Sequence, residues 1–174
     1  MPRMTKQIAA MIGVQTADQL CCDDVERGAV RRFAQAIGDL DPIYTDREYA
    51  SRTRYREPVA PPLFPLAMLR LPFGALDQVD LRANDPDFDG AAESATYGLP
   101  SIPLENSPIV NGGIELELHR YVNHGEPVYV RARYKDIYEK ETSKGWFIFI
   151  VYEVQYIDRD GLPIMTINRI QIRR

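Results

Sequence analysis

The segment at residues 145–157, GWFIFIVYEVQYI, constrains the fold more than any other part of the sequence. Its side chains are mostly large and apolar at odd and even positions alike, and many are β-branched or aromatic. At 13 residues it is shorter than the roughly 20 residues that a helix needs to cross a membrane. Such a run is typical of a central strand that is covered on both faces. We therefore expect a sheet that extends on either side of this strand.

The neighbouring segments repeat with a period of two and predict the other strands. Apolar residues share one face in GIELELHRY (113–121) and alternate with polar ones in EPVYVRARYKDIY (126–138). The sequence DRDG at 158–161 predicts a turn, and LPIMTINRIQI (162–172) predicts the last strand. In its continuation, NRIQIRR (168–174), we interpret the arginines as the solvent face of the strand.

The first part of the chain follows a helical pattern instead. Residues 28–37, GAVRRFAQAI, carry apolar side chains at helical spacing, and Gly38 follows as a helix-ending glycine. Thr45 and Glu48 form a capping-box pattern that predicts a second helix over 46–51.

The segment VAPPLFPLAMLRLP at 59–72 predicts a third helix. Prolines at its start suit a first helical turn, and its side chains are apolar nearly all round. We therefore expect this helix to be buried. A strand-rich second half after one apolar helix indicates an antiparallel sheet wrapped around that helix.

The length of 174 residues fits one domain over residues 1–174. Residues 1–20 are expected to be an N-terminal extension with a short amphipathic helix, because the apolar stretch is too short and lacks the cleavage site of a signal peptide. Residues 73–110 are rich in Gly, Pro, Asn, Asp and Ser without a sustained period. They predict an irregular insertion that is more mobile than the sheet.

Charge and cysteine content narrow the possible functions. The formal net charge of −4 argues against a nucleic-acid partner, and no apolar run is long enough for a membrane span. Cys21 and Cys22 are adjacent and no CxxC pattern is present, which argues against a structural zinc site and a disulfide. We expect a cytoplasmic protein with two free thiols.

The stretch AIGDLDPIYTDREYA at 36–50 carries most of the functional information. Asp39 follows a glycine and precedes an Asp-Pro turn, and Tyr44 comes five residues later. By local chemistry alone, Asp39 could be only a turn residue, and Tyr44 could be only a packing residue.

This stretch, together with VAPPLF at 59–64 and the strands after residue 111, resembles the N-terminal dehydratase domain of the MaoC-like hydratases. The resemblance covers about residues 20–174 and is most specific in its first part. It implies an α+β hot-dog fold, in which a curved antiparallel sheet wraps around a central buried helix. It also implies a hydro-lyase that adds water to an enoyl thioester or removes it from a 3-hydroxyacyl thioester.

The (R)-specific enoyl-CoA hydratases of that family carry the pattern Gly-Asp-x-Asn-Pro-aliphatic-His. Here residues 38–44 read Gly-Asp-Leu-Asp-Pro-Ile-Tyr, so Asp41 replaces the family's Asn and Tyr44 replaces its His. The resemblance makes Asp39 the water-binding acid and base and Tyr44 its partner. Tyrosine has an ordinary pKa near ~10 and is a poorer proton shuttle at neutral pH than histidine.

The thioester oxygen needs hydrogen-bond donors as negative charge develops on it. In the family these come from the start of the buried helix. The substrate-binding residues implied here are Gly38, Ala60, Pro61, Pro62 and Leu63. The two prolines lack an N–H group, which weakens such a donor site. The resemblance implies no metal and no cofactor.

Three functional hypotheses follow. The first is a hydro-lyase acting on an acyl-CoA or acyl-carrier-protein thioester, as a homo-oligomer or a heterodimer with another hot-dog chain. The second is a non-catalytic hot-dog subunit that shapes the acyl-chain tunnel beside a catalytic partner, which the replacement of His by Tyr44 favours. The third and weaker one is a hot-dog thioesterase, although residues 62–71 contain no acid.

Several other residues receive a structural interpretation. His119 and His124 are expected at the surface or in a turn, and Trp146 in the core. The pair Arg131 and Arg133 stays open between a solvated face and a contact with coenzyme A phosphates.

Overall fold

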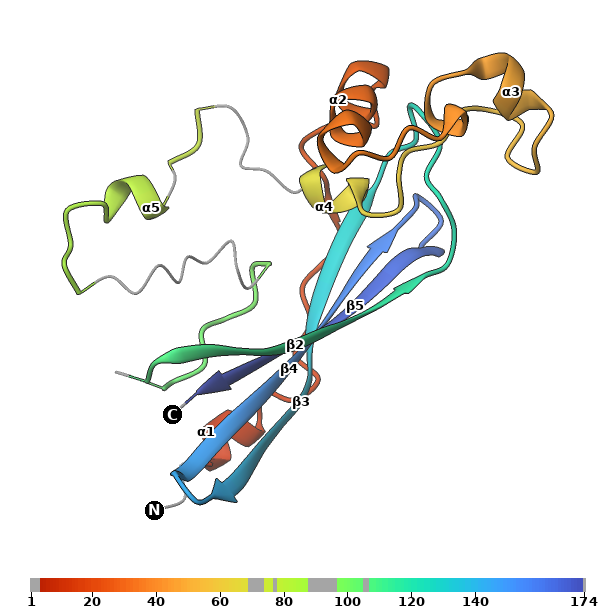
Figure 1. Ribbon diagram of the computed structural model, residues 1–174. Helices are drawn as coiled ribbons and strands as arrows, with labels where there is room; N and C mark the ends of the chain where they lie inside the picture. Colours follow the sequence, from red (N-terminus) through yellow and green to blue (C-terminus); the bar gives the residue numbers. More distant parts are fainter. Residues whose placement is uncertain (1–3, 69–73, 77, 88–96, 105–106, 174) are drawn as a thin grey trace.

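The computed structural model describes residues 4–173 except for 69–73, 77, 88–96 and 105–106. Its main feature is one five-stranded antiparallel sheet in the order β1-β3-β4-β5-β2 (Figure 1). The strands are β1 (Gln19–Leu20), β2 (Ile109–Leu118), β3 (Tyr129–Thr142), β4 (Gly145–Ile157) and β5 (Pro163–Arg173).

Strand β4 lies in the middle of the sheet, as its doubly apolar sequence predicts. The side chains of Ile148, Ile150 and Val154 are buried on one face, together with Val130 and Ala132 of the adjacent β3. The opposite face of β4 is half-buried. The core therefore lies against the first of these faces, and its buried cluster also includes residues of the helical part of the chain, such as Val30, Ala34 and Phe64.

The interpretation of the arginines in β5 as a solvent face is wrong. Arg169 is directly opposite Tyr152 and Arg173 is opposite Ile148, and residues directly opposite each other in an antiparallel pair share a face. Both arginines therefore lie on the face of the core, and Arg173 donates a hydrogen bond of 2.8 Å to the carbonyl of Ser107. Arginine and isoleucine do alternate between the two faces of β5, but a period of two does not indicate which face packs against the core.

The helical elements are α1 (Lys6–Ala9), α2 (Arg27–Ile37), the 3₁₀ turn η1 (Pro42–Tyr44), α3 (Arg47–Ser51), α4 (Phe64–Met68) and α5 (Gln78–Leu81). Figure 1 shows α2, α3 and α4 gathered at one end of the sheet, and α5 apart from it. The expected helix over 28–37 is confirmed, and Gly38 ends it in the left-handed conformation with φ 72°.

The capping box predicted for α3 is wrong. The residue that caps the helix is Asp46, whose carboxylate accepts a hydrogen bond of 3.0 Å from the N–H of Tyr49. Asp is as good a cap as Thr, so the sequence contained two competing start signals one residue apart. The helix itself lies where it was expected.

The helix predicted over 59–72 is described only as α4, and residues 69–73 lie outside the described part. It begins later than predicted because Ala60 donates its N–H to Val122 in an extended segment. The prediction that it is buried all round is also wrong, since Leu63 and Leu66 are exposed while Phe64 and Met68 are buried.

The predicted irregular segment 73–110 contains the short helix α5 and the first residues of β2. Part of this prediction falls on 77, 88–96 and 105–106, outside the described residues. Within the described part, Leu99 is buried in the core, and Tyr134 donates its hydroxyl to the carbonyl of Pro100 at 2.7 Å. This end of the segment is thus packed against the sheet.

The two edges of the sheet differ. Along β3, the N-terminal segment pairs through Gln15 and through β1, and Ile8 of α1 is buried. The other edge strand is β2, where the side chains of Val110, Ile114 and Leu116 are exposed. Within the described residues, none of the helices has the length and apolar character needed to span a membrane.

Candidate functional site

The turn that carries the family pattern, residues 38–44, begins at the end of α2 and is called the motif turn below. Gly38 and Asp39 donate their N–H groups to the carbonyls of Gln35 and Ala34, at 3.3 and 3.0 Å, which closes the helix. The positive φ of Gly38 favours glycine at this position, because other residues adopt it only with strain. The chain is thereby turned so that Asp39 leaves the helix axis and faces the segment that follows.

The turn η1 then brings Tyr44 back to Asp39. Asp41 caps η1 by accepting a hydrogen bond of 2.9 Å from the N–H of Ile43. The hydroxyl of Tyr44 donates a hydrogen bond of 2.7 Å to Oδ2 of Asp39. The N–H of Asp41 donates to Oδ1 of Asp39 at 3.3 Å, so each carboxylate oxygen has one donor.

The environment of Tyr44 keeps its hydroxyl protonated. Burial raises the pKa of Tyr44 well above its usual range, and the hydrogen bond to Asp39 raises it further. At neutral pH the tyrosine is therefore a fixed donor and not a proton shuttle. The carboxylate of Asp39 is half-buried and accepts both of the hydrogen bonds of this turn described above.

The stretch expected to bind the thioester starts beside this pair. The N–H of Val59 donates to the carbonyl of Ile43 at 3.3 Å, and Ala60 is fully buried. Pro61 and Pro62 have no N–H to offer. The structure thus brings the motif turn and the start of α4 together, as the resemblance implied.

Only one N–H group at this start is a candidate donor for substrate. The N–H of Phe64 is bonded to the carbonyl of Pro61 at 2.9 Å, and that of Leu66 to Leu63 at 3.1 Å. The N–H of Leu63 has no backbone acceptor among the described residues. Of the predicted substrate-binding residues, Leu63 is the one able to donate, whereas Gly38 acts as a helix terminator on the exposed side of the turn.

Three residues near the pair were not identified from the sequence. The ring of Tyr55 stacks on that of Tyr121, with centroids 5.2 Å apart and an interplanar angle of 6°. Burial raises the pKa of Tyr121, and the charges of Tyr55, Asp39 and Asp41 raise it further. The next residue, Val122, accepts a hydrogen bond of 2.8 Å from the N–H of Ala60. Arg54 donates a hydrogen bond of 2.6 Å to the hydroxyl of Tyr55.

The loop that carries Tyr121 is fixed by an ion-pair network. Arg120 donates to Oε2 of Glu126 at 3.1 Å and to Oδ2 of Asp158 at 3.0 Å. Glu126 also accepts from the N–H of Asn123 at 2.9 Å. The network ties the loop to the β4–β5 turn and limits the movement of Tyr121.

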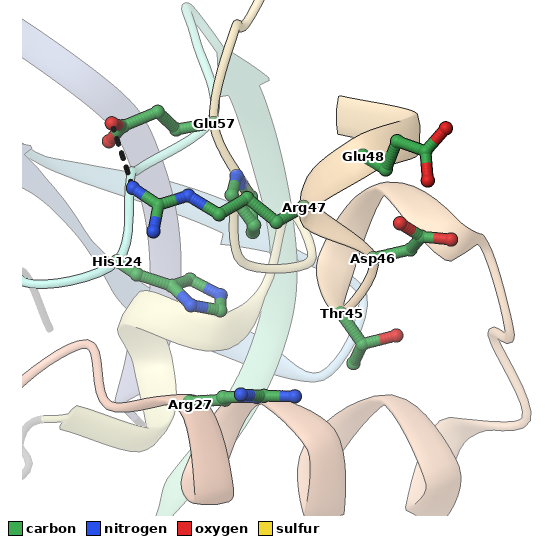
Figure 2. A pocket seen from close by; sticks show the side chains of 8 residues that line it. Arg27, Thr45, Asp46, Arg47, Glu48, Glu57 and His124 are labelled. Atoms are coloured by element: carbon green, nitrogen blue, oxygen red, sulfur yellow. Dashed lines mark ion pairs between the residues drawn. The ribbon is translucent and has the colours of Figure 1, made fainter. Parts of the chain in front are cut away.

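A cavity of about 710 Å³ is lined by Thr45 and Asp46, which directly follow the motif turn in the sequence, and by residues of other segments (Figure 2). His124 and Arg27 contribute to its wall, and Arg47 reaches across to Glu57 with an N–O distance of 3.7 Å. Burial lowers the pKa of His124, although the carbonyl groups of Val59 and Tyr44 oppose this. Its Nε2 is buried without a hydrogen-bond partner among the described residues.

The remaining candidates contact other residues of the sheet. Arg133 bonds to Glu153 at 2.7 Å, and Arg131 to Gln155 at 2.9 Å, on the face of the sheet away from the core. His119 is 2.9 Å from the hydroxyl of Thr166. Within the described part of the chain, no three His, Cys, Asp or Glu side chains are grouped as metal ligands would be.

The chain is similar to known proteins in both sequence and fold. The model of a family described as "FAS1-like, dehydratase domain region" matches residues 10–167. A UPF0336 protein of Thermobifida fusca is 27% identical over 114 residues, which are 66% of this chain and 62% of that protein. A UPF0336 protein of Streptomyces avermitilis is 31% identical over 114 residues, which are 66% of this chain and 63% of that protein. The chain thus spans less than two thirds of the length of these relatives.

Solved structures show the same fold. The ChsH1-ChsH2 complex from Mycobacterium tuberculosis has a chain with a TM-score of 0.69 at 21% identity, covering 97% of this chain and 94% of that one. A chain of the HadBC (3R-hydroxyacyl-ACP dehydratase) complex of the same organism has a TM-score of 0.58 at 17% identity. The match covers 93% of this chain and 96% of that one. The R-hydratase PhaJ1 from Pseudomonas aeruginosa has a TM-score of 0.54 at 15% identity. The match covers 93% of this chain and 81% of that one. The predicted hot-dog fold and the resemblance to MaoC-like dehydratases are confirmed.

Proposed function

This chain belongs to the family described as "FAS1-like, dehydratase domain region", and on that premise we propose that it hydrates an enoyl thioester or dehydrates the corresponding 3-hydroxyacyl thioester. The observation that carries the proposal is the 2.7 Å hydrogen bond between the hydroxyl of Tyr44 and Asp39. It holds a carboxylate in one orientation beside the start of α4.

In the hydration direction, the carboxylate of Asp39 accepts a proton from water while the water oxygen forms its bond to C3 of the substrate. The electron pair of the C2–C3 double bond moves toward the thioester carbonyl and gives an enolate. Asp39 then returns the proton to C2, so that one water has been added and the carboxylate is restored. Dehydration is the reverse of these steps.

Tyr44 supports this cycle as a positioning residue and an electrostatic partner. Its O–H points at Oδ2 and does not compete for the proton, because its pKa is raised by burial and by Asp39. The N–H of Leu63 is the backbone donor at the start of α4 that faces no backbone acceptor in the described residues. It supplies stabilisation to the enolate oxygen, where Pro61 and Pro62 cannot.

A second candidate function is a non-catalytic hot-dog subunit beside a catalytic partner. Two observations favour it: Tyr44 stands where the hydratase pattern has histidine, and two prolines remove donors from the start of α4. The ChsH1-ChsH2 and HadBC structures are complexes of different chains. A thioesterase is less favoured, because α4 contains no acidic residue.

The test is the loss of enoyl absorbance of crotonyl-CoA with purified wild type and with Tyr44→His. An active chain hydrates the substrate alone, and Tyr44→His increases kcat because a group that titrates near neutral pH joins Asp39. Activity that requires a second hot-dog chain identifies the non-catalytic subunit. Release of free coenzyme A thiol, without formation of a hydroxyacyl product, would identify a thioesterase and reject both.

A further inference from the structure

Segment 51–57, SRTRYRE, lies next to the candidate site and contains three arginines that differ in their partners. Arg52 forms an ion pair with Glu48 in α3. Arg54 and Arg56 form no ion pair with any described carboxylate. This leaves positive charge uncompensated at the surface of a chain whose formal net charge is −4.

Arg54 is oriented despite its exposure. Its Nη2 donates to the hydroxyl of Tyr55 at 2.6 Å, and its Cζ lies 4.8 Å from the centroid of the Tyr55 ring. A guanidinium held in this way over an aromatic ring gains cation–π stabilisation and loses less side-chain entropy when it binds an anion. Tyr55 is itself fixed by its stack on Tyr121.

The same stack connects Arg54 to the site. The carboxylates of Asp39 and Asp41 raise the pKa of Tyr121, whereas the charge of Arg54 lowers it. Hydrogen bonds give the same connection, because Ala60 donates its N–H to the carbonyl of Val122, next to Tyr121, and Val59 donates to that of Ile43, next to Tyr44. Asp39 is half-buried, whereas Arg54 is exposed.

We propose that Arg54 binds the phosphate of the phosphopantetheine arm that carries the acyl thioester, with the Tyr55–Tyr121 stack flanking the arm. This inference rests on the proposed function, which requires a thioester substrate. Coenzyme A and acyl carrier protein share this arm and its phosphate, so both are sources of the same ligand chemistry. The planar fork of a guanidinium matches phosphate oxygens with two parallel hydrogen bonds.

The first arm of the test measures binding without turnover. Calorimetric titrations compare phosphopantetheine with pantetheine on wild type, Arg54→Ala, Arg54→Lys and Arg52→Ala. Wild type is expected to prefer the phosphorylated ligand, and Arg54→Ala to weaken its binding by roughly 10- to 100-fold, the range for a hydrogen bond to a charged group. Arg54→Lys should retain part of the preference. Binding of pantetheine should be the same in all variants.

Arg52→Ala is the matched control, because it removes an arginine two positions away that is already paired with Glu48. The inference is overturned if wild type does not prefer the phosphorylated ligand, if Arg54→Ala binds it as well as wild type does, or if Arg52→Ala loses as much affinity. An equal loss for pantetheine also overturns it, because the phosphate would not be the group that is recognised.

The second arm distinguishes coenzyme A from acyl carrier protein as the source of the phosphate. It also distinguishes a failure of the proposed activity from a failure of this inference. Crotonyl-CoA and a crotonyl carrier protein are compared in hydration kinetics with wild type and Arg54→Ala. Arg54→Ala is expected to raise KM with little change in kcat. If both thioesters are substrates, KM should rise for both; if only one is a substrate, KM should rise for that one. Phosphate-dependent binding without hydration would reject the proposed activity alone, whereas hydration with KM unaffected by Arg54→Ala would reject this inference alone.

Discussion

The hydroxyl of Tyr44 lies 2.7 Å from Oδ2 of Asp39 and donates a hydrogen bond to it across the four intervening residues Leu-Asp-Pro-Ile. The contact depends on η1, which folds the five-residue spacing back on itself. Because Tyr44 is 4% exposed, the contact is also part of the core. One side chain thus anchors the turn and orients the acid.

The first prediction concerns stability. Tyr44→Phe removes the hydroxyl and leaves Oδ2 of Asp39 without its buried donor, so the free energy of unfolding should fall by about 1–2 kcal/mol. Tyr49→Phe is the matched control, because Tyr49 is an exposed tyrosine in α3. Urea unfolding of both variants measures the difference. Equal stability of the two variants would show that the hydrogen bond contributes nothing.

The second prediction concerns acid sensitivity. Burial lowers the pKa of His124 in the folded state, so between the folded value and the ordinary value near ~6.5 the unfolded chain binds more protons. His124 therefore makes the free energy of unfolding fall as the pH drops below ~6.5. In His124→Gln, that decline between about pH 7 and 5 should become shallower.

The control for this pH dependence is His119→Gln, because His119 lies at the sheet surface beside Thr166. Its unfolding free energy is measured over the same pH range, so that the loss of a histidine as such is separated from the loss of the buried His124. A profile of His124→Gln that is parallel to the wild type over the whole range would mean that His124 does not titrate in the way its burial indicates.

A third prediction concerns assembly. Strand β2 is an edge strand with the exposed apolar residues Ile114 and Leu116, and such edges are normally paired or covered. We expect a stable oligomer, in which a second hot-dog chain covers this edge. Light scattering at micromolar concentration should show Ile114→Asp shifted toward the monomer.

Leu162→Asp provides the control for assembly, because Leu162 and Ile114 are both 60% exposed but Leu162 lies in the β4–β5 turn. It should keep the wild-type mass. A wild-type protein that is monomeric at this concentration would reject the prediction, as would an equal shift in both variants.

The sheet was largely predictable because its signals are local. The apolar run 145–157 coincides with β4, and the period of two assigned the buried face of β3 correctly. The face of the arginines at 169 and 173 was predicted wrongly, because alternation does not say which side is inside. The start of α4 was also misplaced, since the tertiary bond from Ala60 to Val122 keeps the preceding residues extended.

The candidate site was predictable only where it follows one continuous stretch. Asp39 and Tyr44 belong to a single motif, and a tight turn brings them together. Tyr55 and Tyr121 are 66 positions apart, and nothing in the sequence around either residue indicates that their rings stack. Arg54 was missed for the same reason, because its role depends on the tyrosine beside it and on a loop from the other half of the chain.

The central claim is that the carboxylate of Asp39 transfers the proton, and the most direct measurement compares Asp39→Asn with Asp41→Asn in hydration of crotonyl-CoA. Both variants lose one negative charge in the same turn, but the carboxylate of Asp41 caps η1 by accepting from the N–H of Ile43, and Asp41→Asn keeps the backbone N–H that donates to Asp39. Wild type should be active, and Asp39→Asn should lower kcat by about 10²-fold or more, the usual contribution of a general acid–base group. Asp41→Asn should stay close to wild type. Undiminished kcat in Asp39→Asn, an equal loss in both variants, or no hydration by the wild type alone would contradict the claim.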